Sequence, residues 1–188
     1  FPYTTLFRSA STAAAPRGGG DVALLQRVFA NLCESWFQLH RRFPPTLLDE
    51  MAAAVAEGER THLGEVRVAV ESRLAPLAVL EGLDASTRAR QVFGQLGIWD
   101  TEHNNGVLVY VLLAEHRIEI VADRGIARHV TPEEWAAACT HMRDAYARGQ
   151  WREGSLQGIA DVHALLRRHF PGDGNSRPDE LPDRPVLL

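Results

Sequence analysis

The spacing of apolar residues predicts an amphipathic helix near the start of the chain. Over residues 21–43, apolar side chains recur at intervals of three and four, and Pro44 and Pro45 end the pattern. Asp21 is a suitable N-cap for this helix. Such a helix usually packs its apolar face on its own domain, and the alternative is a helix that lies on a membrane surface. The basic residues cluster at one end and do not line the polar face, so we expect docking on the domain.

Three later segments have the patterns of β-strands. Valines alternate with other residues in 65–71 (EVRVAVE), and residues 117–122 (RIEIVA) begin with the same alternation. Residues 107–113 (VLVYVLL) are apolar on both faces, which is typical of a central strand covered on both sides. The turn at 114–116 is too short for a crossover, so the second and third strands are expected to form an antiparallel hairpin. Residues 72–82 are expected to be a loop.

Helical patterns connect and follow these strands. Asp84 or Ser86 starts a helix that Gly97 ends, so the first two strands are expected to be parallel through a right-handed crossover. Another helix begins at Thr131, where a cap, a proline and a glutamate stand in the favoured order, and the last helix ends at Phe170. These elements predict an α/β fold: a three-layer α/β/α sandwich with a small mixed central sheet, one parallel crossover plus a hairpin, and helices on both faces.

Changes in composition divide the chain into four segments. Residues 1–20 begin with FPYTTLFRS, which resembles translated sequencing-adapter sequence, and continue as a small, Gly-rich stretch that we expect to be flexible. This start leaves open where the natural protein begins and whether a targeting signal precedes it. Residues 21–43 are the N-terminal amphipathic helix and residues 44–170 the main domain. Residues 171–188 are polar and Pro-rich, and we expect a disordered tail.

Composition and charge exclude several classes of protein. The 188 residues carry a formal net charge of −4, so we expect no nucleic-acid partner. No run of about 18 apolar residues exists, so we predict no transmembrane span. Cys33 and Cys139 lie in helical patterns without metal-ligand spacing, and we expect two buried, reduced thiols. Reduced thiols fit a cytoplasmic protein, either free or peripheral to the membrane.

The common catalytic signatures are absent from the sequence. There is no Gly-rich loop ending in Gly-Lys-Ser/Thr, no Gly-x-Ser-x-Gly elbow, and no arginine six residues after either cysteine. The eight histidines include no His-Glu-x-x-His motif and no close pair, so we expect surface residues or helix-end cations. No catalytic residue can be assigned from these patterns.

One group of polar residues is predicted to gather at a sheet edge. In an antiparallel hairpin, the start of one strand lies beside the end of the other, so residues 99–106 and 122–126 should meet. Carboxylate and amide oxygens are ligands that suit Ca²⁺ or Mg²⁺, and an arginine can bind a phosphate. The candidate metal ligands are Asp100, Glu102, Asn104, Asn105 and Asp123, and the candidate phosphate-binding residue is Arg124.

A structural interpretation of the same residues stays open. Asp and Asn before a strand are ordinary turn residues, because their side chains bond nearby backbone, and Asp123, Arg124 and Gly125 could form a salt-bridged turn. Ligands of open α/β sheets usually bind beyond the carboxyl ends of the parallel strands. That edge carries residues 72–82 and 114–117, which are poor in ligands.

The central part of the chain resembles a known family. The string LGIWDTEHNNGVLVYVLLAEHRIEIVADRGI is similar to the heart of the TPM domain, with Asn105-Gly106 before the apolar strand and Gly125-Ile126 after the next one. The stretch AYARGQWREGSLQGIADVHALL resembles the family's closing pattern. The resemblance covers roughly residues 42–170, and the segment from Trp99 to His103 is similar to a stand-alone bacterial branch.

The resemblance implies an α/β sandwich and leaves the activity open. The family includes a plant thylakoid-lumen acid phosphatase, a nematode acetylcholine-receptor modulator and many bacterial proteins, and calcium binding is associated with some members. The stand-alone branch is often encoded beside a membrane-anchored TPM protein and a LemA-type protein, which are the partners implied here. Asn104 stands where the family usually has Asp, which removes one charge from the possible metal site.

Two functions follow as expectations. The first is a binding or assembly module that acts with a membrane-protein neighbour, with Trp36, Phe37 and Phe43 as contacts if they are exposed. The alternative is a divalent-metal-assisted acid phosphatase, a phosphomonoester hydrolase in which the sheet-edge residues hold the metal and the phosphate. A fold shared with a phosphatase does not establish that activity.

Overall fold

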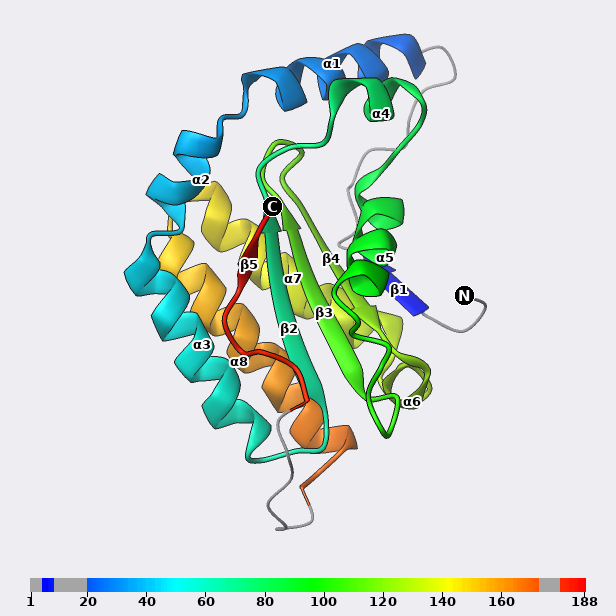
Figure 1. Ribbon diagram of the computed structural model, residues 1–188, viewed down its shortest axis with the longest axis vertical. Helices are drawn as coiled ribbons and strands as arrows, with labels where there is room; N and C mark the ends of the chain where they lie inside the picture. The colour runs from blue at the N-terminus through cyan, green and yellow to red at the C-terminus, as the bar shows by residue number, and fades with distance from the viewer. Residues whose placement is uncertain (1–4, 9–19, 173–179) are drawn as a thin grey trace.

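The computed structural model describes residues 5–8, 20–172 and 180–188, and within them a mixed β-sheet forms the centre of the molecule (Figure 1). The strand order is β1-β4-β3-β2-β5. β2 and β3 are parallel, and β3 and β4 are an antiparallel hairpin, so the predicted crossover and hairpin are confirmed. The strands are β1 (Thr5–Arg8), β2 (Glu65–Glu71), β3 (Gly106–Leu112), β4 (Arg117–Ala122) and β5 (Val186–Leu187).

Helices cover both faces of the sheet, which confirms the predicted α/β sandwich. α3, α7 and α8 pack on one face and α5 on the other (Figure 1). The predicted capping box at Thr131 is present, since its side chain and that of Glu134 bond each other's backbone N–H. These helices are α3 (Pro45–Glu59), α5 (Ala85–Gln95), α7 (Pro132–Ala147) and α8 (Trp151–His169).

Alternate strand residues fill two separate hydrophobic clusters. Val66, Val68 and Val70 of β2 face α3, α7 and α8, whereas Ala69 faces α5. Every residue of β3 is buried, as expected for a central strand with helices on both sides. The hydrophobic effect of this two-sided burial holds the three layers together.

The N-terminal helix is two helices, which differs from the prediction of one. α1 (Gly20–Cys33) and α2 (Trp36–Arg42) are separated at Ser35, whose hydroxyl accepts a 3.1 Å hydrogen bond from the backbone N–H of Phe37. Ser35 therefore caps a new helix and redirects the chain. Apolar spacing continues across the break, which explains why periodicity alone did not reveal it.

Both terminal segments contain strands where flexibility was expected. β1 pairs antiparallel with β4, and residues 1–4 and 9–19 lie outside the described residues. The prediction of a disordered tail is wrong for residues 180–188. There, β5 extends the sheet beside β2, Leu181 is buried, and the Arg67 guanidinium donates to the carbonyls of Pro182 and Arg184. A sheet edge exposes unpaired backbone groups, and the tail provides partners for those of β2.

Two short helices also occupy predicted loops and turns. α4 (Pro76–Leu80) begins at a proline, which is favoured at the first helical position, and it lies in the segment expected to be a loop. α6 (Arg124–Ala127) follows β4 directly. In the part of the chain that is described, no helix is long and apolar enough to cross a membrane.

Candidate functional site

The predicted sheet-edge residues come together at the start of β3 and the end of β4. The Asp123 N–H donates to the Gly106 carbonyl at 2.9 Å, and the Gly125 N–H donates to the Asn104 carbonyl at 2.9 Å. A side chain at position 125 would collide with the carbonyls of Asn104 and His103, so this close approach needs glycine. The hairpin thus places residues 104–106 beside residues 123–125, as its antiparallel pairing requires.

Two buried oxygen atoms at this edge have no hydrogen-bond partner among the described residues. One Asp123 oxygen, Oδ1, accepts from the Arg124 N–H at 2.6 Å at the start of α6, while Oδ2 is buried and unbonded. The Asn105 side-chain NH₂ donates to the Leu63 carbonyl, while its Oδ1 is also buried and unbonded. Buried acceptors without a partner are costly, and both are hard oxygen donors of the kind that Ca²⁺ and Mg²⁺ prefer.

Arg124 lies at the surface of the same edge. Its Nε donates to Asn104 Oδ1 at 2.9 Å, and Asn104 adopts a left-handed conformation with φ of 52°. Asn tolerates this region better than most residues because its short side chain can bond locally. The contact orients the exposed guanidinium and leaves further N–H donors for an anionic group.

The two remaining predicted ligands lie on the exposed loop before β3. The Asp100 and Glu102 side chains are exposed, and the Glu102 N–H is bonded at 3.0 Å to a Glu180 carboxylate oxygen. Among the residues that the structure describes, no three Asp, Glu, His or Cys side chains gather where they could hold a metal ion. Of the five candidate ligands, Asn105 and Asp123 are thus the ones with a buried side-chain oxygen that has no hydrogen-bond partner among the described residues.

A second feature involves α1 and α4, which pack on each other above the β3–β4 turn at the opposite end of the sheet, and α2, which follows α1 in the chain (Figure 1). Large apolar side chains of these three helices are more than half exposed, from 53% for Leu80 to 75% for Phe37. We call this surface the N-terminal apolar face. It consists of Val22, Leu25, Phe29, Leu32, Trp36, Phe37, Leu77 and Leu80.

The expectation that α1 buries its apolar residues on the domain is therefore wrong for most of them. Only Leu24 and Val28 of α1 are partly buried against the α5-side cluster. The predicted contacts Trp36 and Phe37 are exposed, whereas Phe43 is fully buried. Cys33 is exposed too, against the expectation of two buried thiols, and Cys139 is buried as expected.

Polar contacts hold α1 in place. Asn31 is fully buried: its Oδ1 accepts from the Leu74 N–H at 2.7 Å, and its Nδ2 donates to a Glu115 carboxylate oxygen at 3.0 Å. The Arg27 guanidinium forms an ion pair with Glu115 at 3.0 Å and donates to the Leu83 carbonyl at 2.6 Å. This helix is thus fixed to the domain by its polar side while its apolar side faces outward.

Sequence reasoning also missed two buried polar clusters. His62 Nε2 and His163 Nδ1 lie 2.6 Å apart, and His62 Nδ1 accepts from the Gly64 N–H. Both histidines are therefore neutral, with the His62 Nε2–H donating, and burial lowers the pKa of each. These residues are far apart in the chain, and no spacing rule joins them.

The second cluster joins β2, β3 and α5. The Tyr110 hydroxyl donates to Glu71 Oε2 at 2.6 Å, and the Arg88 guanidinium binds the same carboxylate through two nitrogens, at 2.8 and 2.9 Å. Burial next to this carboxylate raises the pKa of Tyr110. The tyrosine therefore stays protonated, and the cluster ties the parallel strands to the covering helix.

Comparisons with known proteins agree with this fold. An NMR structure of the BA42 protein from the psychrophilic bacterium Bizionia argentinensis superposes with a TM-score of 0.66 at 26% identity, covering 76% of this chain and 93% of that one. No curated protein matches the sequence significantly. The family model described as the TPM domain matches residues 43–165. This match spans β2, β3 and β4, the helices α3, α5 and α7 with most of α8, and the sheet-edge residues, and the chain therefore belongs to the TPM domain family.

Proposed function

We propose that this protein is a binding module that docks on a membrane-protein neighbour through the N-terminal apolar face. The observation that carries the proposal is the exposure of large apolar side chains on helices that the domain itself holds in place. α1 and α4 pack on each other, so their exposed apolar side chains lie close together, and exposed apolar patches commonly mark interaction sites. Trp36 and Phe37 add the exposed aromatic side chains that often dominate binding energy.

The position of the face supports an interaction role. The family match begins at residue 43, after α1 and α2. These two helices therefore lie outside the part of the chain that matches the family model. The polar contacts of Asn31 and Arg27 fix α1 before any partner arrives. A partner that meets a preformed helix loses less conformational entropy than one that must order it. An apolar helix of the neighbour would pack its apolar stripe against the exposed side chains of this face.

Capture of the neighbour tests the proposal. The membrane-anchored TPM protein would be expressed on its own, extracted in mild detergent and applied to this protein on a resin. We expect the wild type to retain it and the double variant Phe29→Ser, Trp36→Ser to retain at least tenfold less, since each buried aromatic contributes on the order of 1–2 kcal/mol. Trp99→Ser is the matched control, because Trp99 is 48% exposed and precedes β3, at the other end of the sheet. Equal retention by all three proteins would refute the role of this face.

A metal-assisted phosphomonoester hydrolase is the second candidate. It is supported by the unbonded oxygens of Asn105 and Asp123, which would hold Ca²⁺ or Mg²⁺, and by Arg124, which would bind the phosphate. A bound metal would supply Lewis-acid polarisation of a phosphoryl oxygen. Calorimetric titration of each ion is expected to show saturable binding that Asp123→Ala abolishes and Asp100→Ala retains. An absence of binding to the wild type, or no hydrolysis of p-nitrophenyl phosphate by the metal-loaded protein, would rule this activity out.

A further inference from the structure

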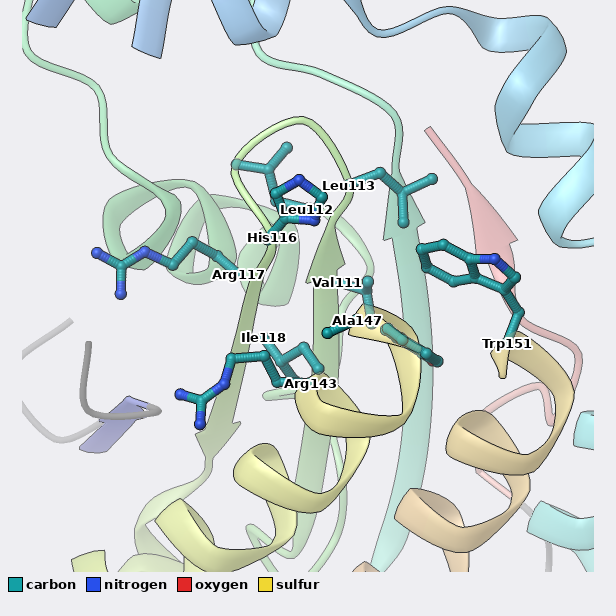
Figure 2. Close-up of a pocket in the computed structure, with 10 residues that line it drawn as sticks. Val111, Leu112, Leu113, His116, Arg117, Ile118, Arg143, Ala147 and Trp151 are labelled. Carbon is teal, nitrogen blue, oxygen red and sulfur yellow. The ribbon is translucent and has the colours of Figure 1, made fainter. Parts of the chain in front are cut away.

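Residues 180–188, which we call the C-terminal segment, are bound along the outer edge of β2. They run beside this strand from Arg67 to Ser72, and β5 within them pairs with β2 in parallel (Figure 1). The Leu188 N–H donates to the Val70 carbonyl at 2.9 Å, and the Ser72 N–H donates to the Leu188 carbonyl at 3.1 Å. Figure 2 shows β5, in faint red, beside the carboxyl end of β2. The segment is thus held as an added strand.

The side chains of the C-terminal segment reach both hydrophobic clusters. Leu181 is buried in the α5-side cluster, and Leu188 packs against the same cluster. Leu187 packs against the other cluster, on the side of α3, α7 and α8. Neighbouring residues of a strand point to opposite faces of its sheet, so an extended chain can make both contacts. These three leucines supply the hydrophobic part of the binding free energy.

Arg67 of β2 binds the backbone of the C-terminal segment. Its side chain is buried, and one guanidinium nitrogen, Nη1, donates to the carbonyls of Pro182 and Arg184, the latter at 2.6 Å. Every residue has a backbone carbonyl, so Arg67 selects an extended chain without selecting its side chains. Arg184 forms an ion pair with Asp49, but both side chains are more than half exposed, and exposed pairs contribute little. Specificity therefore depends on the leucines.

β2 and the C-terminal segment belong to different parts of the chain. The family match covers residues 43–165, which include β2, α3 and α5, and the segment lies beyond the end of this match. All seven residues of β2 are paired with β3, so this strand does not depend on β5 for its place in the sheet. Addition of an extended peptide to a sheet edge is a recurring mode of recognition, in which main-chain hydrogen bonds give affinity and side-chain contacts give specificity. The C-terminal segment makes both kinds of contact.

We propose that the edge of β2 is a binding site for an extended, leucine-bearing peptide segment of a partner protein, and that the C-terminal segment is a ligand built into the chain. The partner segment has leucines at positions equivalent to Leu181, Leu187 and Leu188, and it replaces the C-terminal segment as the added parallel strand. Arg67 binds its carbonyls. Tethering gives the chain's own segment an effective concentration on the order of millimolar, so this segment competes with any incoming peptide. The proposal does not involve the N-terminal apolar face.

The test uses the full chain with its own segment weakened, because the site is occupied in the wild type. In the variant Leu181→Ser, Leu187→Ser, the C-terminal segment loses two apolar contacts and should leave the edge of β2. A synthetic peptide with the wild-type sequence of residues 180–188 is titrated into this ¹⁵N-labelled variant. We expect saturable shifts of the Ser72 amide, whose N–H donates to the segment, with a dissociation constant of ~1 mM or tighter. The wild-type chain should bind the peptide about tenfold more weakly.

Matched variants identify the contacts that matter. A peptide that itself carries Leu181→Ser and Leu187→Ser should bind the variant chain about tenfold more weakly than the wild-type peptide. A peptide with Arg184→Gln should bind within about threefold of the wild-type peptide, because its ion pair is exposed. Adding Arg67→Gln to the variant chain should weaken binding about fivefold, whereas adding Arg90→Gln, on α5, should leave it unchanged.

The proposal is overturned if the wild-type peptide shows no saturable binding to the variant chain at 10 times the ~1 mM expected. It is equally overturned if the peptide with both serines binds as tightly as the wild-type peptide. This comparison changes only the peptide, so it decides the case even if Arg67→Gln does not fold. If the variant chain unfolds, or if its Ser72 amide shows that its own segment stays in place, the segment is part of the core and is not a ligand, which also overturns the proposal.

Discussion

Asn31→Ala should release α1 from the domain while the core stays folded. Asn31 is fully buried and makes two contacts from α1 to the domain, one with the Leu74 N–H and one with the Glu115 carboxylate. A neutral hydrogen bond contributes about 1 kcal/mol, and one to a charged group about 1.5–3 kcal/mol. The substitution also leaves the Leu74 N–H without its partner. Few apolar side chains of α1 are buried, so besides Asn31 mainly the Arg27 contacts with Glu115 and the Leu83 carbonyl oppose its opening.

The expected loss is about 3 kcal/mol for the local opening of α1, which corresponds to roughly a hundredfold shift in its equilibrium. Amide hydrogen exchange measures this directly, because it reports the opening of each segment separately. The α1 amides should exchange about a hundredfold faster in Asn31→Ala, while the β3 amides keep their protection. Gln26→Ala is the matched control, since Gln26 is an exposed amide on the same helix.

Three results would refute this reasoning. If α1 protection changes less than about threefold in Asn31→Ala, the buried asparagine does not hold the helix. If β3 loses protection to the same extent as α1, the helix is part of the cooperative core and is not a separately attached element. A large effect of Gln26→Ala would show that helix propensity, and not the buried contacts, determines the opening.

Two further predictions concern the buried histidines. Burial lowers the pKa of His62 and His163 below the usual 6.5, so the unfolded state binds more protons as the pH falls below that value. The free energy of unfolding should be level above about pH 6.5 and should fall by up to about 2 kcal/mol per histidine at pH 5. Urea unfolding of the wild type and of His62→Gln at both pH values would measure this fall. Gly58→Ala should destabilise by about 1–3 kcal/mol, because the new Cβ would collide with the His163 ring, whereas Gly94→Ala meets no atom and should stabilise by about 0.5–1 kcal/mol. Thermal unfolding of the two alanine variants distinguishes these opposite signs.

The sequence predicted those parts of the fold that local rules determine. The alternating valines of β2, the apolar run of β3 and the short turn after it were enough for the strand pairing. Thr131 and Asp84 cap α7 and α5 as expected, because capping depends on residues within one turn. The meeting of Asn104 and Arg124 at one edge followed from the hairpin alone.

Features that depend on distant contacts were not predictable from spacing. His62 and His163 are bonded across 101 positions of sequence, and Asn31 reaches Leu74 across 43. Periodicity identified an apolar face on α1, but the pattern alone does not say whether other residues cover that face. In the structure, the buried Asn31 holds α1 on the domain with its apolar face outward. The C-terminal strand was missed because it is only two residues long and ends a polar, Pro-rich tail, while its pairing depends on the backbone of β2.

The central claim is that the N-terminal apolar face docks on a membrane-protein neighbour, and Cys33 offers a direct measurement. This thiol is exposed at the end of α1, whereas the Cys139 thiol is buried with its pKa raised by burial to about 12, so a fluorophore can be attached to Cys33 selectively. The labelled protein would be titrated with nanodiscs that contain the membrane-anchored TPM protein and with empty nanodiscs of the same lipid. We predict a saturable change in fluorescence with the loaded nanodiscs, lost in Phe29→Ser, Trp36→Ser, and no change with the empty ones. An equal response to empty nanodiscs, or no response to either, would contradict the claim.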